Sequence, residues 1–191
     1  MKTIVLASAS PRRKALLKQI GLKFKVDIGV QEDVLTAGTE PHQLARHISL
    51  RKTLSVAGNY QDAIIIAADT FGIIDGQILG KPHSENEARA MLQTISGRCH
   101  AVITGFTIMD TDTTKTLSSS VETMVFIKHL TQIEIETYVK SGEPLDKAGA
   151  YAIQGLGAVI VERIEGDYSN VMGLPLCALT TALKEFGINV L

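Results

Sequence analysis

Two adjacent arginines, Arg12 and Arg13, stand where the first turn of a helix is expected. The apolar residues 4–6 indicate a short strand, Ser10 is placed as a helix N-cap, and Pro11 takes the first helical position. Cations in the first turn oppose the helix dipole, whose N-terminal end is already positive. Together with the free backbone N–H groups, the two arginines therefore favour a bound anion, most simply phosphate. The alternative is that both arginines are solvated or paired with a nearby carboxylate.

A single carboxylate, Asp69, follows the apolar run 63–68, which is typical of a central strand covered on both faces. In open α/β sheets, ligands bind beyond the carboxyl ends of the strands, so Asp69 suits a general base or a ligand of a divalent metal. A structural aspartate that caps the following turn is the alternative. Residues 71–80 predict a hairpin with its turn at 75–76, after which Lys81 either returns to the same site or is an ordinary exposed lysine.

Three glycines within nine residues mark the end of the segment 146–157, DKAGAYAIQGLG. This density predicts a loop in which the backbone closely approaches a ligand or another strand. Gln154 offers one acceptor and two donors, which suits the edge of a base, although a bulged strand with a solvated glutamine is the alternative. Taken alone, Lys52 on a predicted helix and Glu32 in a polar loop at 29–38 would both be read as exposed charges.

The elements that must hold these side chains alternate between strand and helix in the first half of the chain, which favours an α/β fold. The patterns predict strands at 2–7, 24–28 and 63–68, and helices at 11–19, from a cap at Thr39 to 57, and from a capping box at 84–87 to Gly97.

The second half of the chain is richer in strand. The patterns predict strands at 99–110 and 115–128, a helix from a capping box at 131–134 to 140, a hairpin made of 158–164 and 168–172, and a last helix from Pro175 to Gly187. No linker or internal repeat divides the chain. We therefore expect residues 1–191 to form a single two-lobed domain, with a long mixed central sheet flanked by helices and a cleft between the lobes.

Composition excludes several classes of protein. The 19 basic and 20 acidic residues nearly balance, so a surface for a nucleic-acid polymer is not indicated. No apolar run approaches the roughly 20 residues that span a bilayer, and the first residues lack a signal-peptide pattern. Cys99 and Cys177 form no CxxC pair, which argues against a zinc site or a disulfide framework. We expect a protein of the reducing cytoplasm that does not bind a membrane.

Taken together, the motifs resemble those of the Maf family of nucleotide pyrophosphatases. The resemblance rests on LASASPRR at 6–13, AADT at 67–70, GKP at 80–82, DKAGAYAIQGLG at 146–157 and GDYSNVMGLPL at 166–176. It spans essentially the whole chain, in order and at the expected spacings. It implies an ITPase-like fold with a nucleotide cleft between the lobes. It also implies hydrolysis of a nucleoside triphosphate to the monophosphate and pyrophosphate, with water attacking the α-phosphorus.

The resemblance also assigns roles to individual residues. Asp69 matches the catalytic proton acceptor and also touches the metal, for which Glu32 is a second carboxylate. The residues that match substrate-binding positions are Ser8, Arg12, Arg13, Lys52, Thr70, Lys81 and Gln154. The resemblance implies a divalent cation, Mg²⁺ before Mn²⁺ or Co²⁺, because cations must offset the charge that builds on the leaving pyrophosphate. A homodimer is expected from the resemblance alone.

The expected substrate follows from three of these positions. Arg12, Thr70 and Gln154 match the branch that acts on dTTP and UTP, including 5-modified pyrimidines. The branch that acts on 7-methyl-GTP typically has Ser-Asp-Gln where this chain has 68–70, Ala-Asp-Thr. Phe71 departs from the aliphatic residue usual in the family and could reshape the base pocket. Two alternatives stay open: the same chemistry on a modified purine triphosphate, and a nucleotide-binding regulator of septum formation.

Overall fold

The computed structural model describes residues 2–29 and 39–191. The chain divides into two compact units. Unit 1 comprises residues 1–70, 104–121 and 172–191, and unit 2 comprises residues 71–103 and 122–171. The α/β class is confirmed, whereas the single domain and the nucleotide cleft expected between two lobes stay predictions.

The described strands form a mixed sheet of seven strands in the order β2-β1-β3-β5-β6-β7, with β4 paired to β3. The strands are β1 Thr3–Leu6, β2 Lys25–Val26, β3 Ala63–Ile74, β4 Gln77–Leu79, β5 Cys99–Asp110, β6 Thr116–Ile127 and β7 Val161–Glu165. In unit 1, β1 pairs in parallel with both β2 and β3. In unit 2, β3 pairs with β4 and β6 with β7 in antiparallel fashion.

Helices account for most of the remaining elements. The α-helices are α1 Pro11–Gln19, α2 Pro41–Ala57, α3 Glu85–Ile95, α4 Gln132–Lys140, α5 Tyr168–Met172 and α6 Leu176–Leu183. The short 3-10 helices are Glu143–Asp146, Ala148–Ala150, Gly155–Val159 and Lys184–Phe186. The segment 146–157 is therefore built from 3-10 turns, not from a bulged strand. None of the described helices is long and apolar enough to cross a membrane.

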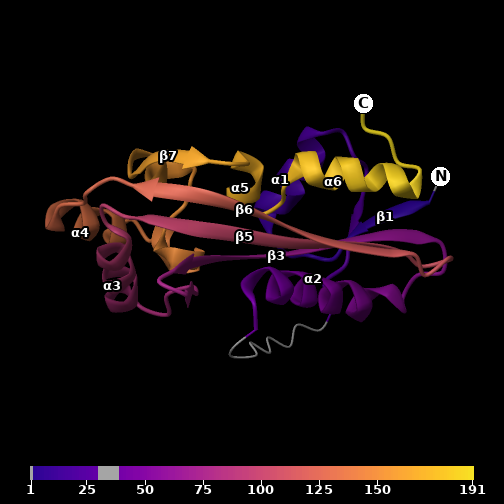
Figure 1. The fold of residues 1–191 in the computed structure, drawn as a ribbon, viewed down its shortest axis with the longest axis horizontal. Coiled ribbons are helices and arrows are strands. Elements are labelled where there is room, and N and C mark those ends of the chain that lie inside the picture. Colours follow the sequence, from indigo (N-terminus) through magenta and orange to yellow (C-terminus); the bar gives the residue numbers. More distant parts are fainter. Residues whose placement is uncertain (1, 30–38) are drawn as a thin grey trace. The chain divides into compact units, whose positions relative to one another are not determined.

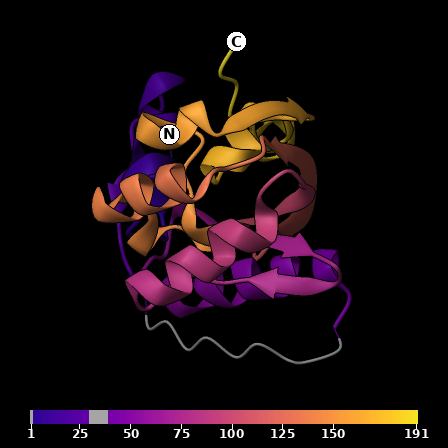
Figure 2. The same cartoon turned by 90° about the vertical axis from the view of Figure 1, so that its left-hand side faces the viewer.

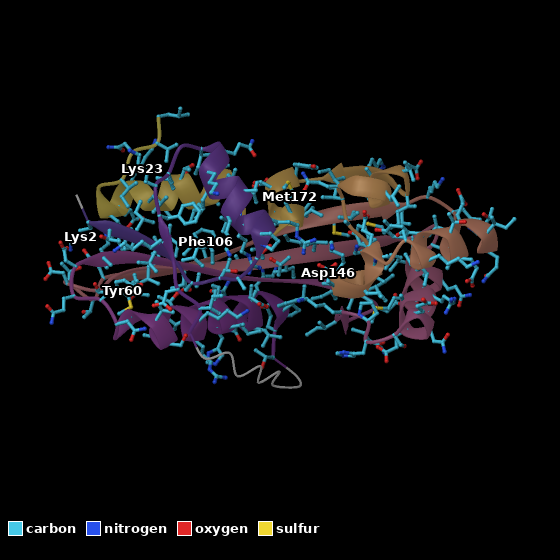
Figure 3. The ribbon with its side chains drawn as sticks, turned by 180° about the vertical axis from the view of Figure 1, so that it is seen from behind. Lys2, Lys23, Tyr60, Phe106, Asp146 and Met172 are labelled. Carbon is cyan, nitrogen blue, oxygen red and sulfur yellow. The ribbon has the colours of Figure 1, made fainter. Side chains whose placement is uncertain are left out.

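Unit 1 has three layers. Helix α2 covers one face of its strands, and α1 and α6 cover the other face (Figure 1, Figure 2). Phe106 of β5 lies in the interior of this unit and is only 1% exposed (Figure 3). The apolar run of β3 stays buried from residue 63 to residue 68, and burial becomes partial at Asp69 and Thr70. The buried apolar run thus places Asp69 and Thr70 at the edge of the core.

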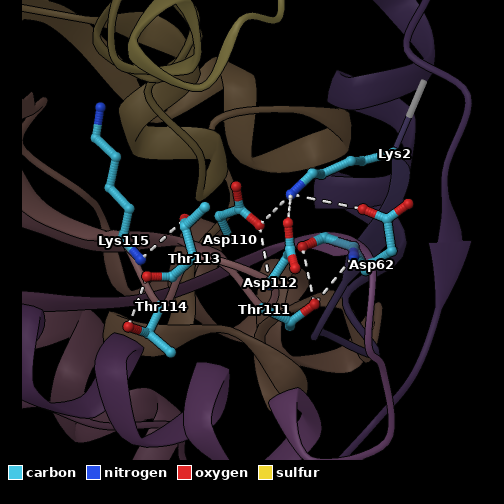
Figure 4. Close-up of polar contacts among 9 residues, drawn as sticks. Lys2, Asp62, Asp110, Thr111, Asp112, Thr113, Thr114 and Lys115 are labelled. Atoms are coloured by element: carbon cyan, nitrogen blue, oxygen red, sulfur yellow. Dashed lines mark hydrogen bonds and ion pairs between the residues drawn. The ribbon is translucent and has the colours of Figure 1, made fainter.

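A cluster of charges ties the first strand of unit 1 to its neighbours (Figure 4). The Nζ of Lys2 lies 2.7 Å from the Oδ1 of Asp110, 3.3 Å from the Oδ2 of Asp112 and 3.5 Å from the Oδ1 of Asp62. The hydrogen bond that Lys2 donates to Asp110 raises the pKa of Lys2, although desolvation acts to lower it. The cluster supports the register in which Thr3 pairs with Ala63, because Asp62 directly precedes β3.

Helix starts mostly follow their capping residues. The Oγ of Ser10 accepts a hydrogen bond from the backbone N of Arg13 at 3.4 Å, as predicted. The cap of α2 is Glu40 and not Thr39, which corrects the prediction. The Glu40 carboxylate accepts from the backbone N of His42 at 3.0 Å and of Gln43 at 2.9 Å, so it satisfies two orphan donors where a threonine hydroxyl would satisfy one.

The two predicted capping boxes in unit 2 differ in detail. The box at the start of α4 is complete, because Thr131 and Glu134 bond reciprocally. At α3, Ser84 accepts from the backbone N of Glu87, but the Glu87 carboxylate accepts from the backbone N of His83 at 2.8 Å. Both helices nevertheless begin where the sequence predicts.

One predicted strand is shorter and more exposed than expected, and another is wrong. The segment 24–28 pairs only through the two residues of β2, and both are exposed, so it is not a half-buried strand. The segment 168–172 is helix α5. Its start is explained by Asp167, whose Oδ1 accepts from the backbone N of Ser169 at 2.7 Å and of Asn170 at 3.2 Å. An aspartate read as a turn residue is here a helix cap, since both roles use the same side-chain geometry.

The core of unit 2 contains a buried histidine. His100 is 2% exposed, and its Nε2 lies 2.8 Å from the hydroxyl of Tyr151. The rings meet edge to face with centroids 5.3 Å apart. The Nδ1 of His100 has no hydrogen-bond partner among the described residues. Burial lowers the pKa of His100 from its ordinary 6.5 to about 4, so the folded protein holds this imidazole neutral at physiological pH.

We expect this histidine to make unfolding easier in mild acid. The unfolded chain binds a proton at His100 as the pH falls through 6.5, whereas the folded chain does not until about 4. The free energy of unfolding should therefore fall by about 2 kcal/mol between pH 7 and pH 5 on account of this residue alone.

Urea unfolding at both pH values measures the effect. His100→Gln keeps a hydrogen-bonding group for Tyr151 but does not titrate, so it should lose this part of the pH dependence. His83→Gln, at an exposed site, is the control and should keep it. If the free energy of unfolding of His100→Gln depended on pH as in the wild type, this would contradict a neutral buried imidazole.

Candidate active site

A lysine–carboxylate pair lies where the apolar run of β3 ends. The Nζ of Lys52 lies 2.6 Å from the Oδ1 of Asp69, and the two side chains are 15% and 21% exposed. Lys52 comes from the middle of α2, next to the buried Thr53, so the helix that packs on the strands also aims the lysine at Asp69. The predicted strand end at 68 is wrong, because β3 continues through Asp69 and Thr70 to Ile74. The structure thus brings together two residues that lie 17 positions apart in the chain.

Arg13 is bound to neutral oxygens. Its Nε donates to the carbonyl of Gly173 at 2.7 Å, its Nη1 to the Oγ of Ser8 at 3.1 Å, and its Nη2 to the Oγ1 of Thr70 at 3.0 Å. Burial lowers the pKa of Arg13, and the nearby charge of Asp69 opposes that shift. The alternative of a solvated or carboxylate-paired side chain is therefore wrong for Arg13, which joins the loop after β1 to Thr70 in β3.

Arg12, the other arginine, differs from Arg13. It is half-buried, and it makes no hydrogen bond or ion pair with any residue that the structure describes. It extends from the first turn of α1, whose N-terminal N–H groups lack intrahelical partners apart from the one that Ser10 receives. Arg13 already donates from its Nε, Nη1 and Nη2, whereas Arg12 donates to no described residue, so Arg12 offers more donors to an anion.

Ser8 and Thr70 support Arg13. Ser8 is 4% exposed, and its Oγ also accepts from the backbone N of Ser10 at 3.3 Å. The Oγ1 of Thr70 lies 2.9 Å from the Oγ1 of Thr104 and 3.4 Å from the carbonyl of Gly173. Both hydroxyls are thus engaged within unit 1.

Sequence reasoning did not single out Thr104 or Gly173. Gly173 has a backbone φ of +114°, and a Cβ there would lie 3.6 Å from both the Nε of Arg13 and the Oγ1 of Thr70. It falls in the segment 166–176, whose resemblance to the family was noted without a residue role. Thr104 lies within a long strand and carries no local signal.

Three further predicted site residues belong to unit 2 or fall outside the described residues. Lys81 and Gln154 belong to unit 2, and both are exposed without a hydrogen bond or ion pair to a described residue. Glu32 lies outside the described residues. Unit 1 therefore brings together Ser8, Arg13, Lys52, Asp69 and Thr70. The participation of the other four predicted residues, Arg12, Glu32, Lys81 and Gln154, stays a prediction.

The described residues hold no cluster of three His, Cys, Asp or Glu side chains that would bind a metal by themselves. Asp69 is a partly exposed carboxylate with only one of its oxygens bonded to Lys52. Mg²⁺ is usually bound by one or two carboxylates together with substrate phosphates and water. Asp69 therefore fits a cation that arrives with a phosphorylated ligand better than a permanent metal centre.

This fold and site define an α/β protein with a lysine–aspartate pair on a central strand and two arginines in the first turn of a helix. The family model described as Maf-like protein matches residues 3–186. The chain belongs to the Maf family.

Similar proteins include two relatives named dTTP/UTP pyrophosphatase. The protein of Methanococcoides burtonii is 51% identical over 191 residues, which is 100% of this chain and 98% of the relative. The protein of Pelotomaculum thermopropionicum is 45% identical over 191 residues, with 100% of both chains covered.

Proposed function

We propose that this protein hydrolyses dTTP and UTP to the nucleoside monophosphate and pyrophosphate. The observation that carries the proposal is the contact of 2.6 Å between Lys52 and Asp69, next to the Arg13 network. The names of the relatives that are 45–51% identical over the whole chain support this substrate class.

The chemistry assigned to Asp69 is proton acceptance. Water attacks the α-phosphorus, the bond from that phosphorus to the oxygen bridging to the β-phosphate breaks, and pyrophosphate leaves. The attacking water gives its proton to the Asp69 carboxylate. Lys52 holds one carboxylate oxygen, which orients the other toward the water. No covalent protein intermediate is required.

The phosphate chain is assigned to the start of α1. Arg12 and the free N–H groups of the first turn provide cationic and dipolar stabilisation for phosphate oxygens. Arg13 holds the loop that precedes α1 in place through its hydrogen bond to Ser8. Thr70 acts through Arg13, since its hydroxyl bonds that side chain. Lys81 adds a further positive charge for the leaving pyrophosphate.

We further propose that Asp69 holds a divalent cation together with the triphosphate, with Glu32 as a second ligand. Mg²⁺ is the expected ion, and Mn²⁺ and Co²⁺ are the alternatives. When bound, such a cation neutralises charge on the phosphate oxygens and favours departure of pyrophosphate.

Base recognition is assigned to Gln154. Uracil and thymine present an N–H donor next to a carbonyl acceptor, and the amide of Gln154 offers the complementary pair. Its exposed side chain has no competing partner among the described residues.

A substrate panel tests the proposal. The purified chain is incubated with each cation and with canonical, 5-modified and 7-methylated nucleoside triphosphates, and pyrophosphate and monophosphate are both measured. Turnover of dTTP and UTP with equal yields of the two products is expected. Turnover confined to a purine would overturn the substrate assignment, and binding without turnover would favour a regulatory role.

The two arginines should respond differently to alanine substitution. Arg13→Ala removes three hydrogen bonds and should lower the free energy of unfolding by about 2 kcal/mol. Arg12→Ala should leave stability within about 0.5 kcal/mol of the wild type but lower kcat/KM about a hundredfold, because a phosphate contact is lost. Urea unfolding and steady-state kinetics of both variants measure this. Equal losses of stability in the two variants would contradict the assignment of Arg13 to structural support and of Arg12 to phosphate binding.

A homodimer and a cytoplasmic location are two further proposals that rest on the family resemblance. Light scattering of the purified chain tests the first, and fractionation of cells tests the second.

A further inference from the structure

One carboxylate in unit 2, that of Glu143, accepts three hydrogen bonds from other groups of the same unit. Glu143, at the start of a 3-10 helix, accepts from the backbone N of Gly157 at 2.9 Å and of Leu156 at 3.1 Å. It also accepts from the hydroxyl of Tyr138 in α4 at 2.8 Å. Three donors on one carboxylate are unusual for a surface glutamate, and two of them are backbone groups of one turn.

Tyr138 extends this contact to the other end of the same loop. Its hydroxyl accepts from the backbone N of Ala152 at 3.1 Å while it donates to Glu143. Tyr138 is 6% exposed and belongs to the apolar core of unit 2. The two side chains therefore fix residue 152 on one side of Gln154 and residues 156 and 157 on the other.

We call the contacts that Glu143 and Tyr138 make with residues 152, 156 and 157 the clamp. The glycines of this loop fit the clamp closely. A Cβ at Gly155 would lie 2.4 Å from the Oε2 of Glu143. A Cβ at Gly157 would lie 2.1 Å from the carbonyl of Ala152 and 2.6 Å from the hydroxyl of Tyr138. The glycines predicted to permit close backbone approach do so toward a carboxylate and a phenol of the same unit.

Glu143 is an anion in this setting. Burial acts to raise its pKa, but the N–H of Gly157, the phenol of Tyr138 and the N–H of Leu156 outweigh burial and lower it. An anion would repel a triphosphate, and the oxygens of this one are directed into its own loop. Binding the phosphates is therefore not its role, whereas shaping the backbone around Gln154 is.

We propose that Glu143 and Tyr138 are positioning residues that hold the loop 152–157 so that Gln154 meets the pyrimidine base. This inference rests on the proposed function and deepens its account of base recognition. Gln154 is exposed, and its side chain makes no capping bond to the following 3-10 helix. Its position is therefore set by the backbone, and the backbone is set by the clamp.

Glu143→Gln tests the proposal with little change of size. An amide supplies one acceptor oxygen and places an NH₂ group against a backbone N–H or the phenol, so the clamp loosens. We expect KM for dTTP and UTP to rise about tenfold with kcat nearly unchanged, because a binding contact and not a chemical one is affected. The preference for UTP over CTP, as a ratio of kcat/KM, should fall by a similar factor. Tyr138→Phe removes the bridge to Ala152 and should act in the same direction.

A double-mutant cycle that combines Glu143→Gln with Gln154→Ala separates an effect on the position of Gln154 from a general effect on folding. If Glu143 acts through Gln154, Glu143→Gln should change KM in the wild-type background and much less in the Gln154→Ala background. Hydrogen exchange of the amides of residues 156 and 157 should speed up in Glu143→Gln, which reports the clamp without using activity. Glu162→Gln, an exposed site on β7, is the matched control and should match the wild type in all readouts.

The outcomes are distinguishable. Faster amide exchange with unchanged KM and unchanged selectivity would overturn the positioning role while the proposed activity stands. Additive effects on KM in the cycle would also overturn it, since Glu143 would then act elsewhere. A wild-type chain that hydrolyses neither dTTP nor UTP would instead overturn the proposed function, and this inference with it.

Discussion

Asp69→Asn is expected to lower kcat about a thousandfold while the affinity for dTTP stays within a few-fold of the wild type. Asparagine has the same shape and can still accept from Lys52 through its amide oxygen. It cannot take a proton from water near neutral pH, so the chemical step fails while the site stays assembled. The assignment of Asp69 as the proton acceptor makes this the largest expected effect on activity of any single substitution in unit 1.

Kinetics and binding must both be measured for this variant. Steady-state rates give kcat, and calorimetry with dTTP gives the affinity. Asp62→Asn, at a residue that contacts Lys2 at 3.5 Å and lies outside the Lys52–Asp69 pair, is the matched control and should keep the wild-type rate. A nearly normal kcat in Asp69→Asn would remove this residue from the role of base. A large loss of affinity with normal kcat at saturation would assign it to binding alone.

Gly105→Ala is expected to cost on the order of 3 kcal/mol or more of the free energy of unfolding. A Cβ at Gly105 would lie 2.2 Å from the carbonyl carbon and oxygen of Ala45 and 2.6 Å from the backbone N of Arg46. These are backbone atoms of α2, so no rotamer change can relieve the clash. The helix must move away from β5, and Lys52 on the same helix must move with it.

Gly58→Ala is the control for this substitution. Gly58 has a helical φ of −62°, and a Cβ there would meet nothing within 4 Å, so alanine should be neutral or slightly stabilising. Urea unfolding of both variants measures the difference. Activity should also fall in Gly105→Ala, because the contact of Lys52 with Asp69 depends on the position of α2 against β5. A loss below about 1 kcal/mol would mean that α2 can shift without cost.

Much of the fold follows from local patterns. The cap at Ser10, the complete capping box at Thr131 and the turn at 75–76 each depend on residues close together in the chain, and the structure confirms them. The failures have the same origin. Asp167 signals a turn and a helix cap equally well, and Glu40 competes with Thr39 for one role. Neighbouring residues alone cannot decide such cases.

The sequence by itself determined the family, the α/β class and the residue types of the site, because motifs and periodicity are properties of short segments. Only the tertiary structure decided that Arg13 donates to Ser8, Thr70 and Gly173, whereas Arg12 donates to no described residue. These two neighbours in sequence differ because a helix turns each successive side chain by about 100°, so Arg13 faces Thr70 of β3 and Arg12 does not. The Glu143 clamp likewise joins residues 14 positions apart, and no local pattern encodes such a contact.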